Sequence, residues 1–198
     1  KYKCDCSDYE SLKKIINGIE EKIDIIIHSA GAGEWKFLQE MEIDEINGCL
    51  DAPLRASINL THLTLPKMIE NNNGQITFIQ SPVIIQPWRS CTAYSISRWG
   101  MRGLSESLKA DLYNTNINIS EVILGRTESN YFLNNKTPKI GNIINRITPE
   151  DAAIAVLTAT QNKKPYYYYP SMMKVVVYLQ YLFPDIVKYL TYKTSWHD

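Results

Sequence analysis

Short apolar segments alternate with segments of helical spacing along most of this chain. Residues 23–29 form a nearly continuous apolar run, and residues 75–80, 117–124 and 165–169 are further strand-like segments. Apolar runs without polar alternation are typical of strands that are buried on both faces of a sheet. Strands that alternate with helices predict a parallel sheet with crossover helices. We therefore expect an α/β fold, a doubly wound parallel sheet that carries helices on both faces.

The segments between these runs carry helix signals. Ser7 or Asp8 can cap a first helix, and Thr148 followed by Pro149 is a strong start for a later one. The full set of expected helices covers residues 8–22, 44–70, 92–113 and 148–161.

The two ends of the chain carry separate expectations. Residues 1–6 have the pattern of a further strand, with Cys4 and Cys6 on opposite faces. We expect the sheet domain to span residues 1–170 and an apolar helical tail to span residues 171–198. The tail could be a lid over a substrate cleft, a subunit interface, or a segment that lies on a membrane surface.

Three of the apolar runs are followed by a residue that interrupts the pattern, namely Gly31, Ser81 and Gly125. The carboxyl ends of parallel strands lie at one edge of a sheet, and sheets of this kind bind ligands at that edge. The sequence therefore predicts a ligand site where these three residues meet.

Tyr94 and Arg98 are spaced to lie on the same face of the helix expected to follow Ser81. A hydroxyl at the end of the preceding strand can reach that face. We interpret Tyr94 as a general acid/base that exchanges a proton with a substrate oxygen. Ser81 would hydrogen-bond the same oxygen, and Arg98 would stabilise the ionised tyrosine. This combination indicates redox chemistry between a carbonyl and an alcohol.

Each of these residues also has a purely structural interpretation. Tyr94 could be a packed helix residue, Ser81 could cap its loop, and Arg98 could form a salt bridge at a surface or interface. The position of His28 at a strand end favours a hydrogen-bonded structural role over a catalytic one. A substrate cleft or the core could hold the three tryptophans Trp35, Trp88 and Trp99.

Charge and cysteine content argue against several classes of protein. The chain has 21 basic and 21 acidic residues, whereas a nucleic-acid-binding protein would show a basic excess. Neither metal-ligand spacing nor a disulfide pattern is found among Cys4, Cys6, Cys49 and Cys91. We therefore expect reduced thiols, a cytoplasmic location and no metal site. No apolar run reaches the roughly eighteen residues that a membrane span requires.

Several motifs together resemble those of the short-chain dehydrogenase/reductase family. Ser81, Tyr94 and Arg98 stand where that family has its catalytic Ser, Tyr and Lys. His28-Ser29-Ala30-Gly31 is similar to the family's Asn-Asn-Ala-Gly motif, and Cys4-Asp5-Cys6-Ser7-Asp8 is similar to its Asp-Val-x-Asp segment. Leu124-Gly125 stands where the family has Pro-Gly, and Ser129 stands where it has the Thr that follows.

The resemblance implies a Rossmann-like fold and an NAD(P)-dependent oxidoreductase that interconverts an alcohol and a carbonyl. The apolar tail and the many aromatic residues favour a lipophilic small molecule as its substrate. The resemblance implies NAD or NADP as the cofactor, with NADP slightly favoured. The residues that would bind the cofactor are Asp5 near the adenine, Ser29, Ala30, Gly31, Tyr94, Arg98, Gly125 and Ser129. Relatives pair through helices that correspond to residues 44–70 and 92–113, so the resemblance also implies a homodimer.

The chain departs from the family pattern in four places. The resemblance begins at the family's third strand, so we expect an N-terminally truncated fold that lacks the Gly-rich phosphate turn. A fold without this turn should bind a dinucleotide poorly. Arg98 replaces the family's Lys and Leu124 replaces its Pro. Pro53 stands where the family has a catalytic Asn, but it keeps the backbone carbonyl that holds a relay water in the family.

These departures leave two interpretations open. The segments Ala30-Gly31-Ala32-Gly33, Ala52-Pro53 and Tyr94 to Trp99 resemble a subgroup of the family with Arg in place of Lys, which favours an active enzyme. The alternative is a catalytically silent relative that acts as a binding or scaffold subunit, which Arg98 and Pro53 would favour.

Overall fold

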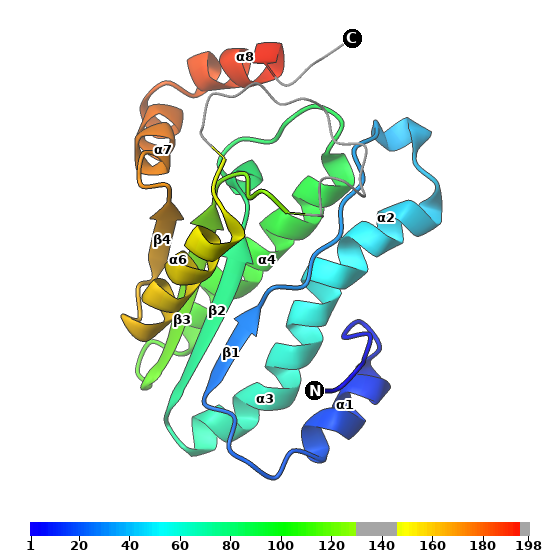
Figure 1. The fold of residues 1–198 in the computed structure, drawn as a ribbon, viewed down its shortest axis with the longest axis vertical. Coiled ribbons are helices and arrows are strands. Elements are labelled where there is room, and N and C mark those ends of the chain that lie inside the picture. Colours follow the sequence, from blue (N-terminus) through cyan, green and yellow to red (C-terminus); the bar gives the residue numbers. More distant parts are fainter. Residues whose placement is uncertain (130–145, 195–198) are drawn as a thin grey trace.

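The computed structural model of this protein describes residues 1–129 and 146–194, and a parallel sheet forms its centre (Figure 1). The strands of the described part are β1 (Ile25–His28), β2 (Gly74–Gln80), β3 (Ile117–Leu124) and β4 (Tyr166–Tyr169). They lie side by side in chain order, and each neighbouring pair is parallel. The parallel sheet expected from the apolar runs is confirmed.

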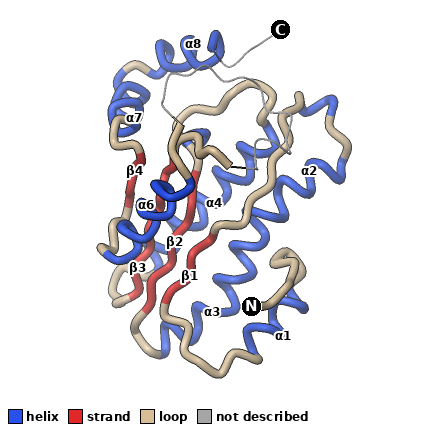
Figure 2. Tube along the Cα trace, in the orientation of Figure 1, coloured by secondary structure: helices blue, strands red, loops and turns tan. Residues whose placement is uncertain are grey.

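Helices connect the strands and cover the sheet, as Figure 2 shows. The α-helices of the described part are α1 (Tyr9–Asn17), α2 (Ile43–Leu50), α3 (Ala56–Glu70), α4 (Thr92–Asp111), α6 (Pro149–Gln161), α7 (Met173–Leu182) and α8 (Pro184–Thr194). Short helical turns lie at Leu38–Glu40 (η1), Asp51–Arg55 (η2) and Pro82–Ile84 (η3).

Neighbouring residues of β2 show that helices cover both faces of the sheet. Phe78 packs in the core cluster that includes Met68 of α3 and Met101 of α4. Ile79 packs with Val156 of α6, on the opposite face. Because successive strand residues point to opposite sides, α3 and α4 cover one face and α6 covers the other. The expected Rossmann-like architecture is therefore present.

β1 is less covered than its apolar run predicted. Ile26 and His28 are buried, whereas Ile25 is 56% exposed and Ile27 is 38% exposed. The prediction of burial on both faces holds for β2 and β3 and is wrong for β1. In the described residues this strand has helix packing on one face only.

Two predictions near the amino terminus are also wrong. Residues 1–6 form no strand, because Asp5 accepts hydrogen bonds from the backbone N–H and the hydroxyl of Ser7 and so closes a turn. The first helix ends at Asn17 rather than near residue 22, and Gly18 serves as its C-cap. Glycine has a low helix propensity, which the pattern of apolar residues alone does not record.

The helix expected over residues 44–70 is interrupted by the π-helical turn η2, which contains Pro53. Proline lacks a backbone N–H and its ring clashes with the preceding turn of an α-helix, so a wider turn accommodates it. The Ser57 hydroxyl donates a hydrogen bond to the Pro53 carbonyl oxygen at 2.6 Å. The carbonyl to which the family resemblance assigns a relay water therefore already has a partner in this chain.

The carboxyl-terminal helices α7 and α8 lie beyond the end of β4, at the top of Figure 1. Met173 at the start of α7 is buried in the cluster that surrounds Tyr94, and this contact fastens the tail to the sheet domain. Within the described residues, no helix is long and apolar enough to cross a membrane.

Candidate active site

Tyr94 lies in the first turn of α4, at the carboxyl-terminal edge of the sheet. Its side chain is 7% exposed and packs in a cluster with Val83, Ile123 and Met173. The ring of Trp35 lies against it, with 5.2 Å between the ring centroids. The structural interpretation, a packed helix tyrosine, therefore accounts for the ring and leaves the role of the hydroxyl open.

Arg98 follows one turn later on α4 and points to the same place. Its guanidinium carbon lies 5.0 Å from the centroid of the Tyr94 ring, and its Nη1 donates to the Ile79 carbonyl oxygen at 2.9 Å. The side chain also meets the loop after β1, because a Cβ on Gly31 would lie 2.7 Å from Nη2. Arg98 is only 8% exposed, so it is not a surface residue. Its Nε is buried and has no hydrogen-bond partner among the residues that the structure describes.

Ser81 directly follows β2 and begins the turn η3. Its Oγ accepts a hydrogen bond from the Val83 N–H at 3.4 Å. The indole N–H of Trp99 on α4 donates to the Val83 carbonyl oxygen at 3.1 Å, which ties this turn to the helix of Tyr94. The serine therefore does cap its loop, and its hydroxyl lies in a turn that is held against α4.

The other residues predicted to bind a cofactor fall into two groups. Ser29, Ala30 and Gly31 are exposed in the loop after β1, beside Arg98. Gly125 directly follows β3, and its N–H donates to the Tyr169 carbonyl oxygen at 2.7 Å. The edge predicted from Gly31, Ser81 and Gly125 is therefore real, since all three follow neighbouring parallel strands.

Asp5 and Ser129 are not brought to Arg98 by any described contact. Hydrogen bonds from the backbone and hydroxyl of Ser7 hold the pKa of Asp5 below its usual range. The hydrogen bonds described for Asp5 stay within its own turn. Ser129 is exposed at the last described position before residue 130.

Two tryptophans form an aromatic wall beside Tyr94. The rings of Trp35 and Trp88 are stacked, with 6.1 Å between their centroids, and both pack on the cluster that contains Tyr94. The Trp35 indole N–H is buried without a hydrogen-bond partner. Trp99 does not belong to this wall, because it is 47% exposed and lies outside the cluster that contains Tyr94.

His28, the last residue of β1, has the structural role that its position favours. Its ring stacks on Phe78 at 4.7 Å, and its Nε2 lies 3.1 Å from the Thr61 hydroxyl. Burial lowers the pKa of His28 to about 4.

This burial predicts a loss of stability in mild acid. In the unfolded chain His28 gains a proton below about pH 6.5, whereas the folded chain resists that proton until about pH 4. The contribution of His28 to the free energy of unfolding is therefore at its full value above pH 6.5 and declines as the pH falls towards 4. We expect His28 to remove about 2 kcal/mol from the free energy of unfolding between pH 7 and pH 5. Urea unfolding of the protein and of His28→Gln at pH 7 and pH 5 isolates the contribution of His28. If the free energy of unfolding of both proteins changes equally between these pH values, the prediction is wrong.

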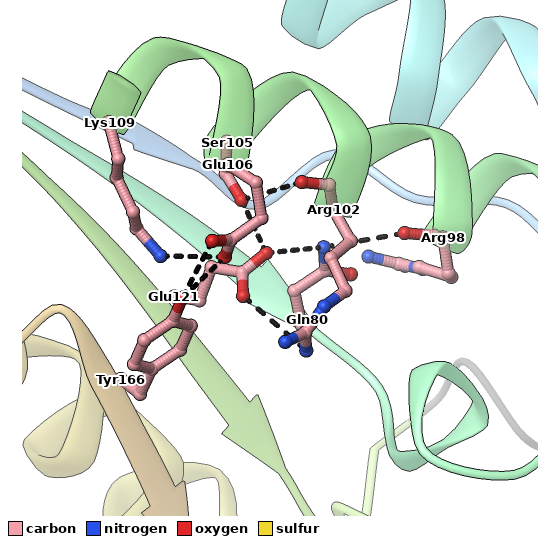
Figure 3. A network of polar contacts seen from close by, with 8 residues as sticks. All are labelled: Gln80, Arg98, Arg102, Ser105, Glu106, Lys109, Glu121 and Tyr166. Carbon is pink, nitrogen blue, oxygen red and sulfur yellow. Dashed lines mark hydrogen bonds and ion pairs between the residues drawn. The ribbon is translucent and has the colours of Figure 1, made fainter. Parts of the chain in front are cut away.

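A buried polar network beneath the site did not emerge from the sequence motifs. Figure 3 shows Glu121 of β3 surrounded by Gln80 of β2 and by Arg102 and Ser105 of α4. The available signal was a carboxylate within an expected buried strand, since a buried charge needs partners.

Comparison with known proteins identifies the family that this arrangement belongs to. The family model described as short chain dehydrogenase matches residues 1–139. The chain belongs to the short-chain dehydrogenase family. A short-chain dehydrogenase of Burkholderia cenocepacia, solved in complex with NADP, has a TM-score of 0.83 over 96% of this chain and 80% of that one, at 16% identity.

Curated relatives of this short-chain dehydrogenase have names that denote reductases. The sepiapterin reductase of Chlorobaculum tepidum is 25% identical over 78% of this chain and 64% of its own length. The ketoacyl reductase HetN of a Nostoc species is 29% identical over 79% of this chain and 55% of its own length. The chain thus spans between half and two thirds of the length of such relatives.

Proposed function

We propose that this short-chain dehydrogenase is an NAD(P)-dependent oxidoreductase that interconverts an alcohol and a carbonyl. The observation that carries the proposal is the buried pair Tyr94 and Arg98, which lies against Gly31 where the parallel strands end. A tyrosine that is packed only for structure has no need of a buried cation at its ring and a glycine beside that cation.

The residues present fit the ribose and nicotinamide end of such a cofactor. Ser29, Ala30 and Gly31 are exposed in the loop after β1, and the missing Cβ of Gly31 leaves room for the guanidinium of Arg98. The buried Nε of Arg98 is a donor that still lacks a partner. When bound, the cofactor supplies or accepts the hydride. NADP is slightly favoured over NAD, as the family resemblance implies.

The three site residues would divide the proton chemistry between them. Tyr94 exchanges a proton between its hydroxyl and the substrate oxygen. Ser81 donates a hydrogen bond to that oxygen and steadies the charge that develops on it. Arg98 lies close enough to the Tyr94 ring to stabilise the ionised form and to hold the ribose hydroxyls.

The surroundings of Tyr94 support a lipophilic substrate. The cluster around it consists of apolar and aromatic side chains from five segments of the chain, among them Trp35, Trp88, Ile84 and Met173. A wall of this kind lowers the free energy of an apolar ligand by burying its surface.

Cofactor binding tests the proposal directly. We expect NADPH and NADH fluorescence to change on titration with the protein, and Arg98→Met to weaken this binding at least tenfold. Tyr166→Phe serves as the matched control, because it removes a hydroxyl on β4 that bonds Glu106 of α4 rather than this pair. The titration is made on this chain and on a form extended upstream, because a fold without the phosphate turn binds a dinucleotide poorly. Failure of the folded extended form to bind either nucleotide would indicate the silent binding or scaffold role instead.

A homodimer is proposed through the outer side of α3 and α4. Ile58 of α3 and Ile96 and Trp99 of α4 are exposed apolar residues on these helices. Sedimentation velocity measures the state of the protein, and Ile96→Arg is expected to shift a dimer towards the monomer.

The tail of residues 171–198 is proposed as a separate segment that contacts a membrane surface, on a protein that is otherwise cytoplasmic. The described part of the tail exposes apolar residues at helical spacing on both helices, with lysines beside them. These are Val175, Tyr178, Leu179 and Leu182 on α7, Ile186, Tyr189 and Leu190 on α8, and Lys174, Lys188 and Lys193. Tyrosine and lysine next to an apolar stripe suit the interface of an anionic bilayer. Flotation with phosphatidylserine vesicles measures this contact, and a protein that stays at the bottom would refute it.

A further inference from the structure

Glu121 is a carboxylate in the middle of the sheet, and its side chain is 0% exposed. Its Oε1 accepts hydrogen bonds from the Ser105 hydroxyl at 2.5 Å and from Gln80 Nε2 at 3.3 Å. Its Oε2 faces Arg102, whose Nη1 lies 3.8 Å away. Figure 3 shows that these partners come from β2 and α4, the two elements that carry the proposed site.

Gln80 connects this carboxylate to the site. It is the last residue of β2 and directly precedes Ser81. Its Nε2 lies 3.4 Å from the Arg98 carbonyl oxygen as well as 3.3 Å from Glu121. One side-chain amide thus bridges the strand end that leads to Ser81 and the helical turn that carries Arg98.

The chemistry of the Arg98 carbonyl fixes which way that amide points. The Arg98 carbonyl can only accept a hydrogen bond, so it selects the NH₂ end of Gln80. That same end then donates to Oε1 of Glu121. A buried polar group costs free energy unless it is paired, so these contacts favour one arrangement of the amide. Among the described residues Gln80 Oε1 and Glu121 Oε2 have no hydrogen-bond partner, so the two contacts of Gln80 Nε2 alone connect Glu121 to the turn of Arg98.

We propose that Gln80 and Glu121 are positioning residues that set Ser81, directly after β2, in register with Tyr94 and Arg98 on α4. This inference rests on the proposed function for its kinetic consequence, but the geometry that it describes can be read without turnover.

The far end of the network supplies a matched control. The Tyr166 hydroxyl lies 2.7 Å from both Glu106 oxygens, and Lys109 donates to Glu106 at 2.9 Å. These contacts fasten the same helix to β4, but they do not include Gln80 or Arg98 (Figure 3). Tyr166→Phe therefore removes an anchor of α4 and leaves the bridge to Ser81 in place.

The test compares Gln80→Met, Glu121→Gln and Tyr166→Phe in the whole protein. Gln80→Met keeps the volume of the side chain and removes the amide. We expect it to lower kcat at least tenfold with NADPH affinity within threefold, and to move the basic limb of the pH profile to higher pH. Glu121→Gln should change the same quantities in the same direction, and the double variant should be no worse than Gln80→Met alone. Tyr166→Phe should leave kcat and the pH profile unchanged.

Hydrogen exchange reads the same positioning without turnover. We expect faster exchange in peptides that cover residues 81–86 and 94–99 in Gln80→Met and Glu121→Gln, but not in Tyr166→Phe. If exchange in these peptides matches the unmodified protein, the inference is wrong, whatever the kinetics show. If exchange changes as expected but the unmodified protein neither binds nucleotide nor turns over, the proposed function fails and the positioning stands.

Discussion

Replacing Tyr94 with phenylalanine is expected to lower turnover by about 10³-fold, within the range that general acid/base groups contribute. The phenyl ring fills the same space among Trp35, Ile123 and Met173, so the fold should be retained. Arg98 keeps its bond to the Ile79 carbonyl oxygen, so cofactor binding should change little. Initial rates with a panel of ketones and NADPH, together with a fluorescence titration of NADPH, measure both quantities.

Tyr168→Phe is the matched control for this substitution. Tyr168 is a partly buried member of the same cluster, but it lies on β4 and has no place in the proposed proton transfer. Its loss should leave turnover within twofold. If Tyr94→Phe keeps more than a tenth of the activity of the unmodified protein, the assignment of Tyr94 as the acid/base is wrong.

Much of the fold could be predicted from local patterns. The strand at residues 117–124 was predicted with its observed bounds, because an apolar run stopped by Gly125 leaves little freedom at either end. The start of α6 was also predicted, and Thr148 accepts a hydrogen bond from the Asp151 N–H as a capping residue should. Residues 1–6 were misjudged, since an alternating pattern does not show whether a strand has a neighbour to pair with.

The sequence predicts where the site residues lie in the fold, but it does not predict which side chains contact one another there. The spacing of Tyr94 and Arg98 and the breaks at Gly31, Ser81 and Gly125 follow from helix and strand periodicity. The approach of Arg98 to Gly31 and the packing of Trp35 against Tyr94 join residues far apart in the chain. The bridge from Glu121 through Gln80 to Arg98 has the same character. Contacts of this kind depend on how the layers pack, which no local pattern records.

Variants of Arg98 distinguish the active enzyme from the catalytically silent relative, the two interpretations left open by Arg in place of the family's Lys. If Arg98 serves the proposed chemistry, Arg98→Lys should keep turnover within about tenfold, because a cation remains near the tyrosine ring. Arg98→Met should lower turnover by about 100-fold and move the basic limb of the pH profile to higher pH, since the ionised tyrosine loses its neighbouring charge. Rates between pH 6 and pH 10 for the three proteins test this order.

Arg98 also contributes to the stability of the fold, so the free energy of unfolding of both variants must be measured beside their turnover. Both substitutions disturb the bond from Nη1 to the Ile79 carbonyl oxygen, and a buried carbonyl left without a partner costs about 1–3 kcal/mol. Urea unfolding should therefore show a similar loss for Arg98→Lys and Arg98→Met, while turnover separates them. If the two variants lose activity equally and in proportion to stability, the buried cation serves packing alone. The charge then has no part in the reaction, and Tyr94 must ionise without it.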